Sequence, residues 1–260
     1  MSFILRLGET TLKGKNRPFF EKQLLNNVQR LVKCKASKAG GRLYVESEPA
    51  DFRRVFGLTS FSPAIKTKLD YDSIEGECLR MAEGRTGSFK IRSQRLDKKY
   101  TLSSMELNVK LGASVVEKFG LKVKMDNPDL VIGVEVTKDS AYVFSEVIQC
   151  FGGLPVGCEG QVSAWIEDKK SLLAALLLLK RGCYVIPMGS KEFDISLLRL
   201  YGCDRHFRVC EMKDFIGEAL VVGDTLETFK EYNVSPVLRP LIGYSEERVD
   251  KELKKYESVC

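Results

Sequence analysis

Residues 89–112 constrain the fold of this chain more than any other stretch. Their first part, FKIRSQR, alternates: in an extended chain Phe89 and Ile91 point to one side, and Lys90 and Arg92 point to the other. This period-2 pattern is typical of a strand that buries one face and exposes the other. The sequence therefore predicts a strand with one core-facing side and one cationic side.

A helix is predicted directly after this strand. Ser103 or Ser104, followed by Glu106, forms the pattern of a capping box at a helix N-terminus. The apolar residues that follow at helical spacing are Leu107, Leu111, Val115, Val116 and Phe119. These five positions are expected to face the core.

Positive charge continues from the strand into the loop, at Arg95, Lys98 and Lys99. Free backbone N–H groups and the helix dipole favour anions at a helix N-terminus, and cationic side chains add to that preference. The segment thus predicts an anion-binding site. A solvated, charged edge is the alternative reading of such a charge run.

Strands and helices alternate along the rest of the chain. The first 58 residues predict a β-α-β-β-α order, with a short helix at 50–56. Leu130–Thr137 and Ala141–Ile148 predict a β-hairpin, because both segments are rich in Val and Ile. Beyond residue 160, short apolar strands that alternate with helices predict a small parallel layer.

Several motifs, in order, carry a resemblance to a known family. They are RLGETTLKGKNRPFFEKQLLNNVQRLV (6–32), FGLTSFSPA (56–64), the 89–112 segment, NPDLVIGVEV (127–136), AYVFSEVI (141–148) and GGLPVGCEGQV (152–162). Together they resemble the tRNA 4-thiouridine synthetases (ThiI family). The resemblance is dense over about the first 160 residues, and it returns at ALVVGDTLETF (219–229) and SPVLRPLIG (235–243).

The resemblance implies an α/β (α+β) chain of three domains. They are a ferredoxin-like domain at 1–59, a THUMP α/β domain at 60–150, a linker at 151–161 and a degenerate, shortened, Rossmann-like PP-loop domain at 162–260. THUMP domains bind the acceptor end of tRNA in this family, so tRNA is the partner that the resemblance implies.

The resemblance also implies where RNA is bound. The acceptor stem would lie along the loop of Lys13, Lys15 and Arg17, and the single-stranded 3′ end would lie in the THUMP cleft. Phe89 and Tyr100 are candidates for base stacking, with a place in the core as the equal alternative for both. The predicted RNA-binding residues are Lys13, Lys15, Arg17, Lys90, Arg92, Arg95, Lys98 and Lys99.

The sequence departs from the family at the nucleotide loop. The family's S-G-G-x-D-S loop wraps ATP phosphates with backbone amides. It falls here on Ile166, Glu167, Asp168, Lys169, Lys170 and Ser171, where only the final serine matches. The carboxylates of Glu167 and Asp168 would repel a triphosphate. The sequence therefore predicts no ATP-binding residues, and Asp224, in a shortened second motif, is expected to be a helix N-cap.

The charge of the chain is unevenly distributed. Residues 1–148 hold 26 Lys and Arg residues against 18 Asp and Glu residues, a net charge of +8. Residues 149–260 hold 15 against 17, a net charge of −2. Because phosphate binding needs clustered cations, this asymmetry favours a nucleic-acid partner for the first two domains.

Cysteine and histidine content argues against a metal site. None of the eight cysteines lies at C-x-x-C spacing, and His206 is the single histidine. The sequence predicts no metal ligands and no catalytic residues. Sulfur transfer on Cys203 or Cys210 is an alternative that the resemblance implies, because both lie in roughly the region of the family's sulfur-carrying cysteine, although neither is assigned to it residue by residue.

The leading hypothesis is a noncatalytic, cytoplasmic tRNA-binding protein without a cofactor, which delivers tRNA to a separate catalytic or sulfur-transfer protein. The alternative is an active tRNA sulfurtransferase of 4-thiouridine or thiamine thiazole biosynthesis, using ATP and Mg²⁺ through an altered or partner-supplied site. A third hypothesis is that the protein is a structural subunit of a homodimer.

The longest apolar run, Leu172–Leu179, is too short to span a membrane.

Overall fold

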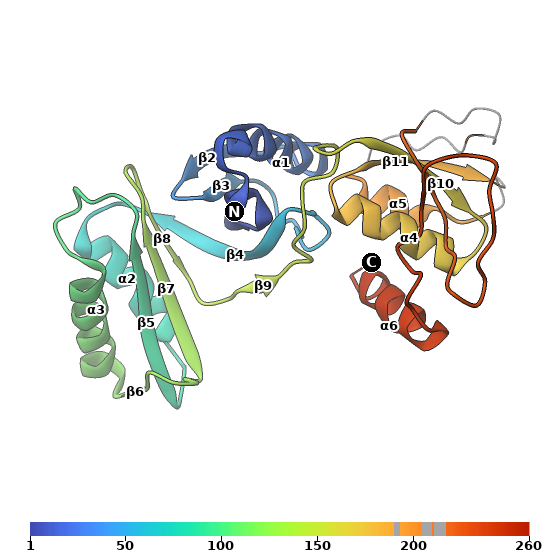
Figure 1. Cartoon of the computed structure of the whole chain (residues 1–260). Helices are drawn as coiled ribbons and strands as arrows, with labels where there is room; N and C mark the ends of the chain where they lie inside the picture. The colour runs from blue at the N-terminus through green and yellow to red at the C-terminus, as the bar shows by residue number, and fades with distance from the viewer. Residues whose placement is uncertain (190–192, 204–209, 211–216, 260) are drawn as a thin grey trace. The chain divides into compact units, whose positions relative to one another are not determined.

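The computed structural model describes residues 1–189, 193–203, 210 and 217–259 (Figure 1). The chain divides into two compact units. Unit 1 comprises Met1–Arg6, Cys34–Pro49 and Phe61–Ile148. Unit 2 comprises Leu7–Lys33, Ala50–Ser60 and Gln149–Cys260.

A long mixed sheet forms the framework of unit 1. Its strands are β1 (Ser2–Leu7), β2 (Lys35–Ala39), β3 (Arg42–Glu46), β4 (Leu58–Thr67), β5 (Ser88–Arg95), β6 (Lys122–Val123), β7 (Leu130–Val136), β8 (Ala141–Phe144) and β9 (Ile148–Gln149). The order is β2-β3-β1-β4-β8-β7-β5-β6, with β9 beside β4. The β5–β7 and β5–β6 pairs are parallel, whereas β7–β8 and β4–β8 are antiparallel.

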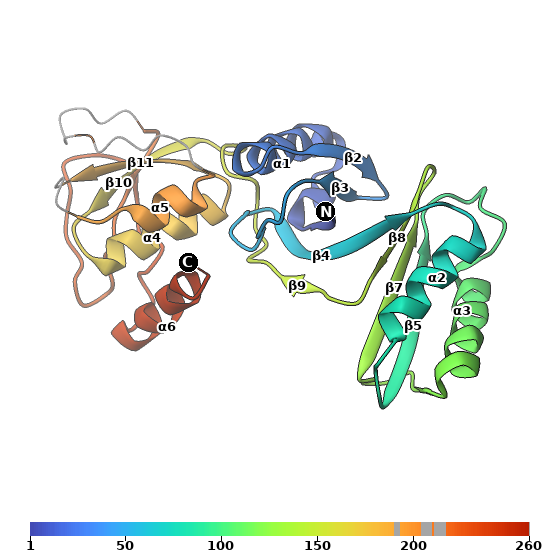
Figure 2. The same cartoon turned by 180° about the vertical axis from the view of Figure 1, so that it is seen from behind.

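Two helices cover one face of the β5–β7–β8 part of this sheet, as Figures 1 and 2 show from opposite sides. They are α2 (Tyr71–Ala82) and α3 (Ser104–Phe119). The core between helices and sheet includes Ile74, Leu107, Leu111, Ile132 and Val134, all fully buried. Because burial of these apolar side chains favours folding, this layer fixes the orientation of β5.

The predicted capping box is confirmed at Ser103. Its hydroxyl accepts a hydrogen bond from the N–H of Glu106 at 3.2 Å, and its own N–H donates to the Glu106 carboxylate at 2.7 Å. The helix ends at Gly120, whose φ of 66° lies in the left-handed region that glycine adopts without strain. Local sequence therefore sets both ends of α3.

The beginning of unit 2 is a loop followed by a helix. Two 3₁₀ turns, η1 (Glu9–Leu12) and η2 (Gly14–Asn16), precede α1 (Arg17–Leu31). The prediction of a helix at 50–56 is wrong, because this segment forms turns. Its apolar residues Phe52, Val55 and Phe56 are fully buried, so packing has overridden the helical spacing.

The rest of unit 2 is a small parallel sheet with helices. Its strands are β10 (Gln161–Ile166), β11 (Tyr184–Gly189), β12 (Leu220–Val221) and β13 (Val237–Leu238), in the order β11-β10-β12-β13. All three pairs are parallel. The helices are α4 (Lys169–Lys180), α5 (Ser196–Tyr201) and α6 (Glu246–Glu257). The α/β fold class predicted from the sequence is confirmed.

An aromatic cluster lies in the core of unit 2. Phe56 stacks on Tyr201 with ring centroids 5.3 Å apart, and Phe151 stacks on Tyr256 at 4.7 Å. The Tyr201 hydroxyl donates to the backbone carbonyl of Tyr256 at 2.8 Å. These contacts join segments from distant parts of the sequence into one core.

Within the described residues, no helix is both long enough and apolar enough to cross a membrane.

Candidate nucleic-acid interface

Strand β5 has one buried face and one exposed face, as the sequence predicts. Phe89 and Ile91 are buried against α3, while Arg92 and Gln94 are exposed on the opposite face. Phe89 is fully buried in the core, which is the alternative to base stacking that the sequence left open for it. Tyr100 is partly buried and packs against the same core.

Arg92 lies on the sheet face that α2 and α3 leave uncovered. Its side chain is exposed and forms no ion pair with any residue that the structure describes. Its neighbour Gln94 is held by a hydrogen bond from the Arg42 guanidinium to the Gln94 side-chain oxygen. Arg92 is therefore a cation that is free to contact a phosphate.

The other predicted cations of this segment do not all join Arg92. The Arg95 guanidinium donates to the carbonyl of Tyr100 at 3.1 Å, and the Arg95 N–H donates to the Ser104 hydroxyl at 2.9 Å. Lys98 and Lys99 are exposed in the turn that follows. Arg95 thus braces this turn, and the lysines supply exposed charge beside it.

The N-terminus of α3, where the sequence predicts an anion site, holds a carboxylate of this chain. The Ser103 N–H and hydroxyl hydrogen-bond to Glu106 and hold the pKa of that carboxyl below its usual range. Because the side chain of Glu106 neutralises this end of the helix, phosphate binding nearby must rely on lysine and arginine side chains.

A buried carboxylate that sequence reasoning missed organises the uncovered sheet face. Glu135 on β7 accepts hydrogen bonds from Arg42 at 3.0 Å, from the Tyr44 hydroxyl at 2.7 Å and from Arg6 at 3.5 Å. Burial raises the pKa of Tyr44, with the Glu135 charge adding to the effect, and burial lowers the pKa of Arg6. A lone carboxylate in the apolar strand LVIGVEV was the available signal.

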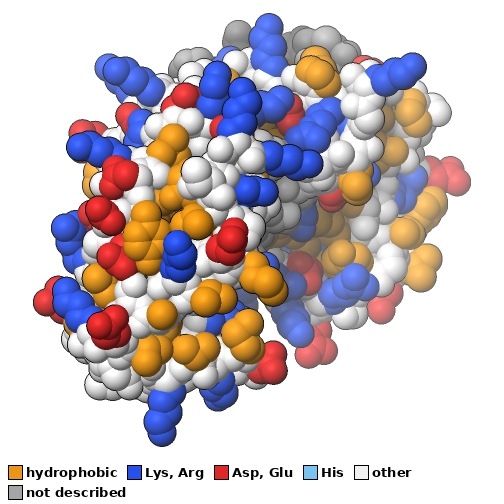
Figure 3. All heavy atoms as spheres, turned by 90° about the vertical axis from the view of Figure 1, so that its left-hand side faces the viewer, with side chains coloured by type: hydrophobic (Ala, Val, Ile, Leu, Met, Phe, Trp, Pro, Cys, Tyr) orange, Lys and Arg blue, Asp and Glu red, His pale blue; other side chains and the backbone are white. Residues whose placement is uncertain are grey.

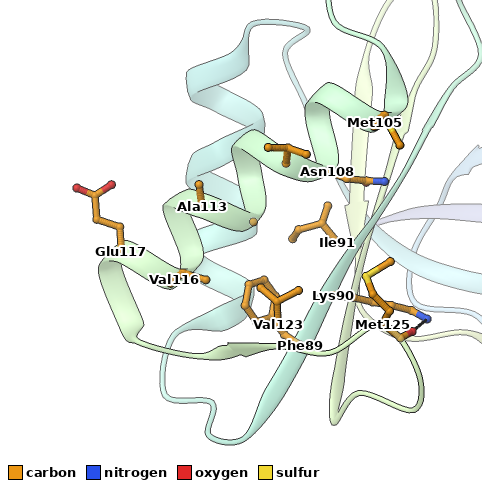
Figure 4. Close-up of a pocket in the computed structure, with 12 residues that line it drawn as sticks. Phe89, Lys90, Ile91, Met105, Asn108, Ala113, Val116, Glu117, Val123 and Met125 are labelled. Atoms are coloured by element: carbon orange, nitrogen blue, oxygen red, sulfur yellow. Dashed lines mark hydrogen bonds between the residues drawn. The ribbon is translucent and has the colours of Figure 1, made fainter.

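A groove of about 640 Å³ runs beside β5, between α3 and the chain from Val123 to Met125 (Figure 4). The ammonium group of Lys90 lies at its edge and donates to the Met125 carbonyl at 2.8 Å, as the dashed line shows. Lys90 and Arg92 therefore differ: the first has a backbone partner at the groove, and the second lies exposed on the sheet.

The second predicted cluster lies in unit 2. Lys13 pairs with Glu159 at 3.1 Å, and Arg17 pairs with Glu21 at 2.7 Å. Lys15 is exposed and pairs with no carboxylate among the described residues. The loop thus carries three cations on a local scaffold, of which Lys15 is the one without a carboxylate partner.

The segment that aligns with the family's nucleotide loop follows β10, and the Ser171 side chain hydrogen-bonds to its backbone. The Ser171 hydroxyl accepts hydrogen bonds from the N–H groups of Glu167 at 3.0 Å and Asp168 at 2.9 Å. The Ser171 N–H in turn donates to the Asp168 carboxylate at 2.8 Å, which completes a capping box. These amides, which a phosphate would need, already have a partner within the chain.

Side chains around this loop also have internal partners. The Glu167 carboxylate accepts from the Trp165 indole at 3.1 Å and from the Lys230 ammonium at 3.2 Å. The two lysines of the loop pair with α6: Lys169 with Asp250 at 2.6 Å, and Lys170 with Glu246 at 2.7 Å. The positive charges nearest the loop are therefore matched by carboxylates.

Asp224 does not cap a helix, contrary to expectation. Its buried carboxylate accepts hydrogen bonds from the Tyr232 hydroxyl at 2.9 Å, the Arg239 guanidinium at 3.2 Å and the Lys230 N–H at 3.2 Å. Preceding it, Gly223 packs so closely that an added Cβ would lie 2.4 Å from the Ser171 nitrogen. Asp224 thus closes the 224–239 loop on itself, and Gly223 packs against the start of α4.

The described residues contain no group of histidine, cysteine, aspartate and glutamate side chains arranged for a metal ion. Of the two cysteines considered for sulfur transfer, Cys203 is buried and Cys210 is partly buried. His206 lies outside the described residues.

Family models match two segments of the chain, which together cover most of residues 1–148. Residues 2–62 match the ThiI ferredoxin-like domain, and residues 70–146 match the THUMP domain. This is a THUMP-domain protein related to the tRNA sulfurtransferases. The resemblance inferred from the sequence motifs is thereby confirmed.

Curated relatives support the same relationship. A probable tRNA sulfurtransferase of Mycoplasmopsis synoviae is 38% identical over 206 residues, covering 75% of this chain and 55% of the relative. One from Moorella thermoacetica is 36% identical, covering 75% and 53%. The chain thus spans about half the length of these relatives. The probable tRNA sulfurtransferase of Methanocaldococcus jannaschii is 26% identical, covering 99% and 89%.

Two solved structures share the fold over nearly the whole chain. A Pyrococcus horikoshii crystal structure aligns with a TM-score of 0.86 and 26% identity, covering 98% of this chain and 99% of that one. A 4-thiouridine synthetase solved with RNA and bound ATP aligns with a TM-score of 0.82 and 24% identity, covering 99% and 85%.

Proposed function

We propose that this protein binds the acceptor stem and 3′ end of tRNA and has no ATP-pyrophosphatase chemistry of its own. The observation that carries the first part is Arg92, an exposed cation on the uncovered THUMP sheet face that pairs with no carboxylate in the part of the chain that the structure describes. The observation that carries the second part is the Ser171 hydroxyl, which accepts hydrogen bonds from the loop amides.

Two observations support tRNA as the partner: the charge of the chain and its similarity to tRNA sulfurtransferases. Residues 1–148, which contain both family matches, carry a net charge of +8. A structural neighbour of the same fold is a 4-thiouridine synthetase in complex with RNA. Cations clustered in one part of the chain supply the counterion release that drives RNA binding.

We assign each RNA segment to one cationic cluster. The single-stranded 3′ end is assigned to the surface around Lys90, Arg92 and Arg95, with Lys98 and Lys99 beside it. The acceptor stem is assigned to Lys13, Lys15 and Arg17. The corresponding domain division is 1–59, 60–150, a linker at 151–161, and 162–260 for the degenerate PP-loop domain.

The case against an autonomous ATP site rests on the altered loop. A triphosphate there would have to displace Ser171 from two amides and approach the carboxylates of Glu167 and Asp168. Each lost hydrogen bond costs about 1 kcal/mol, and the like charges add to the penalty. Catalysis would then come from a separate catalytic or sulfur-transfer protein to which this chain presents tRNA.

An electrophoretic mobility shift with tRNA, with and without the 3′ CCA, tests the RNA-binding part. Arg92→Glu should weaken tRNA binding, and the loss should be smaller for tRNA that lacks CCA. Lys251→Glu, an equally exposed cation of α6, is the matched control. Equal binding by wild-type protein and Arg92→Glu would refute the assignment.

Isothermal titration with ATP and Mg²⁺ tests the second part independently of RNA. We expect no binding by the wild-type protein. Saturable binding that is lost on substitution of the 166–171 loop would refute it.

A second candidate is an active tRNA sulfurtransferase that uses ATP and Mg²⁺ through an altered or partner-supplied site. The observation in its favour is that the Methanocaldococcus jannaschii relative, named a probable tRNA sulfurtransferase, aligns with 99% of this chain. Formation of adenylated tRNA by the purified protein would establish it.

A further inference from the structure

An aromatic side chain is exposed in the first turn of α1. Phe19 is 56% exposed. In the part of the chain that the structure describes, the other largely exposed aromatic residue is Phe229, and the Arg239 guanidinium lies over its ring, 4.4 Å from the centroid. No cation of the described residues covers Phe19 in this way. Its ring is therefore accessible to a ligand.

The core of unit 2 does not use the exposed surface of this ring. The core side of α1 is formed by Phe20, Leu24 and Val28, which are buried. Phe19 contacts Phe20 edge to face, with ring centroids 5.5 Å apart and an interplanar angle of 87°. An edge-to-face contact covers at most one face of the Phe19 ring. The buried Phe20 thus supports this ring and leaves a face of it open.

Exposed apolar side chains elsewhere in the chain are of a different kind. Figure 3 shows the face that carries α3, with hydrophobic side chains gathered between lysine and arginine side chains. The large apolar side chains that α3 exposes are Met105, Val109 and Val116, which have no ring. RNA bases are recognised by stacking on aromatic side chains. Phe19 offers such a plane, and the exposed residues of α3 do not.

The segment around Phe19 is strongly basic. Residues 10–33 hold six Lys and Arg residues and one carboxylate, Glu21. The Glu21 side chain is 4% exposed and pairs with Arg17 at 2.7 Å. Lys22 is exposed and pairs with no carboxylate among the described residues. Because residues three apart are neighbours on a helix surface, Lys22 lies on the same side of α1 as Phe19.

The loop before α1 adds cations on the other side of Phe19 in sequence. Lys15, four residues earlier, is exposed and pairs with no described carboxylate. Lys13 pairs with Glu159, and its ammonium group lies 4.5 Å from the centroid of the Phe20 ring. The carboxylates Glu21 and Glu159 are thus each paired with a cation, whereas Lys15 and Lys22 remain available for phosphate.

An aromatic plane between two available cations matches the chemistry of a nucleotide. We propose that Phe19 stacks on an open base face of the bound tRNA, while Lys15 and Lys22 contact phosphates on either side. The inference rests on the tRNA binding proposed above. A double-stranded stem exposes a base face only at its end, so the base belongs to the end of the acceptor stem or to the unpaired nucleotides beside it.

Fluorescence anisotropy of labelled tRNA with the full-length protein tests this proposal. Phe19→Leu keeps an apolar side chain but removes the aromatic plane, so it should weaken tRNA binding about fivefold or more. The loss should be the same at each salt concentration, because the variant removes no charge and releases no fewer counterions. Phe19→Tyr keeps the ring and should bind like the wild type.

Two further variants serve as references. Lys22→Ala should weaken binding and lower the slope of log K against log salt concentration by about 0.7 to 0.9. Phe229→Leu, at the other exposed aromatic residue of unit 2, should bind like the wild type. The side chains changed are exposed, so these variants and those of Phe19 should melt close to the wild type.

A tRNA trimmed to the last base pair of the acceptor stem identifies the stacked base. If Phe19→Leu weakens binding of the trimmed tRNA as well, the base lies at the end of the stem. If the loss disappears, the base belongs to the unpaired nucleotides. Both results support stacking on Phe19.

Two results would overturn the inference and leave the proposed function intact. The first is wild-type affinity of Phe19→Leu for tRNA. The second is a loss of affinity for Phe19→Tyr as large as that for Phe19→Leu, which would show that the aromatic plane is not what binds. Failure of the wild-type protein itself to bind tRNA would refute the proposed function, and the inference with it.

Discussion

The Glu135 carboxylate accepts a hydrogen bond from the Arg42 guanidinium at 3.0 Å, although 93 residues separate them in sequence. Glu135 is 4% exposed and Arg42 is 17% exposed. The pair links β7 of the THUMP segment to β3 of the N-terminal hairpin within unit 1. Arg42 also donates a hydrogen bond to the side-chain oxygen of Gln94, which lies two residues after Arg92 on β5. A buried carboxylate thus orders the surface assigned to RNA.

Glu135→Gln should destabilise unit 1. The substitution removes a negative charge that faces Arg6 and Arg42 in a buried setting, and it leaves those two guanidinium groups without a counterion. Loss of one partner of a buried ion pair costs about 3 kcal/mol. Urea denaturation followed by far-UV circular dichroism measures the change in the free energy of unfolding.

Glu146→Gln is the matched control, because Glu146 is exposed in the same unit. It should change the free energy of unfolding by less than about 0.5 kcal/mol. If both variants unfold like the wild type, the Glu135 cluster does not stabilise the fold.

Alkaline pH should weaken the packing of Cys78. Burial raises the pKa of this thiol from 9.0 to about 12. The folded state therefore keeps the proton that the unfolded chain gives up above pH 9. The contribution to stability is full below pH 9 and is lost as the pH rises toward 12, by about 1.4 kcal/mol per pH unit.

Comparison with Cys78→Ala isolates this thiol from lysine titration. Between pH 9.5 and 10.5, the free energy of unfolding of the wild type should fall faster than that of the variant by about 1.4 kcal/mol. Parallel pH profiles for the two proteins would show that the Cys78 thiol ionises equally in both states.

Local patterns predicted much of unit 1. The alternation of β5 and the capping box of α3 both follow from neighbouring residues, because strand period and helix capping are short-range effects. The structure accordingly places Phe89 and Ile91 in the core and Ser103 at the N-cap. The predicted parallel layer of unit 2 also holds.

Long-range partners explain what the sequence could not predict. The 50–56 segment has helical spacing but packs its apolar side chains as turns. Asp224 looks like a cap, yet Tyr232 and Arg239, which follow it by 8 and 15 residues, bind its carboxylate instead. Glu135 requires β1 and β3 beside β7 before its role can be recognised. Each depends on which segments meet, and one sequence does not specify that.

Ser171→Ala should destabilise unit 2. The hydroxyl satisfies the N–H groups of Glu167 and Asp168, and the residue is 2% exposed. Both hydrogen bonds are partly buried, and the loss of each costs about 1 kcal/mol. The melting curve followed by Trp165 fluorescence measures this in the same unit. Ser258→Ala, at the exposed residue that follows α6, should melt close to the wild type.

Arg92→Ala should lower both the tRNA affinity and its salt dependence. If Arg92 contacts one phosphate, its removal releases one fewer counterion on binding. The slope of log K against log salt concentration should then fall by about 0.7 to 0.9. Fluorescence anisotropy of labelled tRNA gives this slope directly when it is measured from about 50 to about 300 mM KCl, a range over which the Debye length falls from about 14 to about 6 Å.

Two further variants define the result. Lys251→Ala removes an exposed cation from α6 and should leave the slope unchanged. Arg95→Ala removes the hydrogen bond to the Tyr100 carbonyl together with the charge, so it should lower the affinity through both the lost cation and the lost order of the loop. A weaker affinity with an unchanged slope for Arg92→Ala would show that Arg92 supports the surface without contacting phosphate. An unchanged affinity would remove this sheet face from the RNA interface.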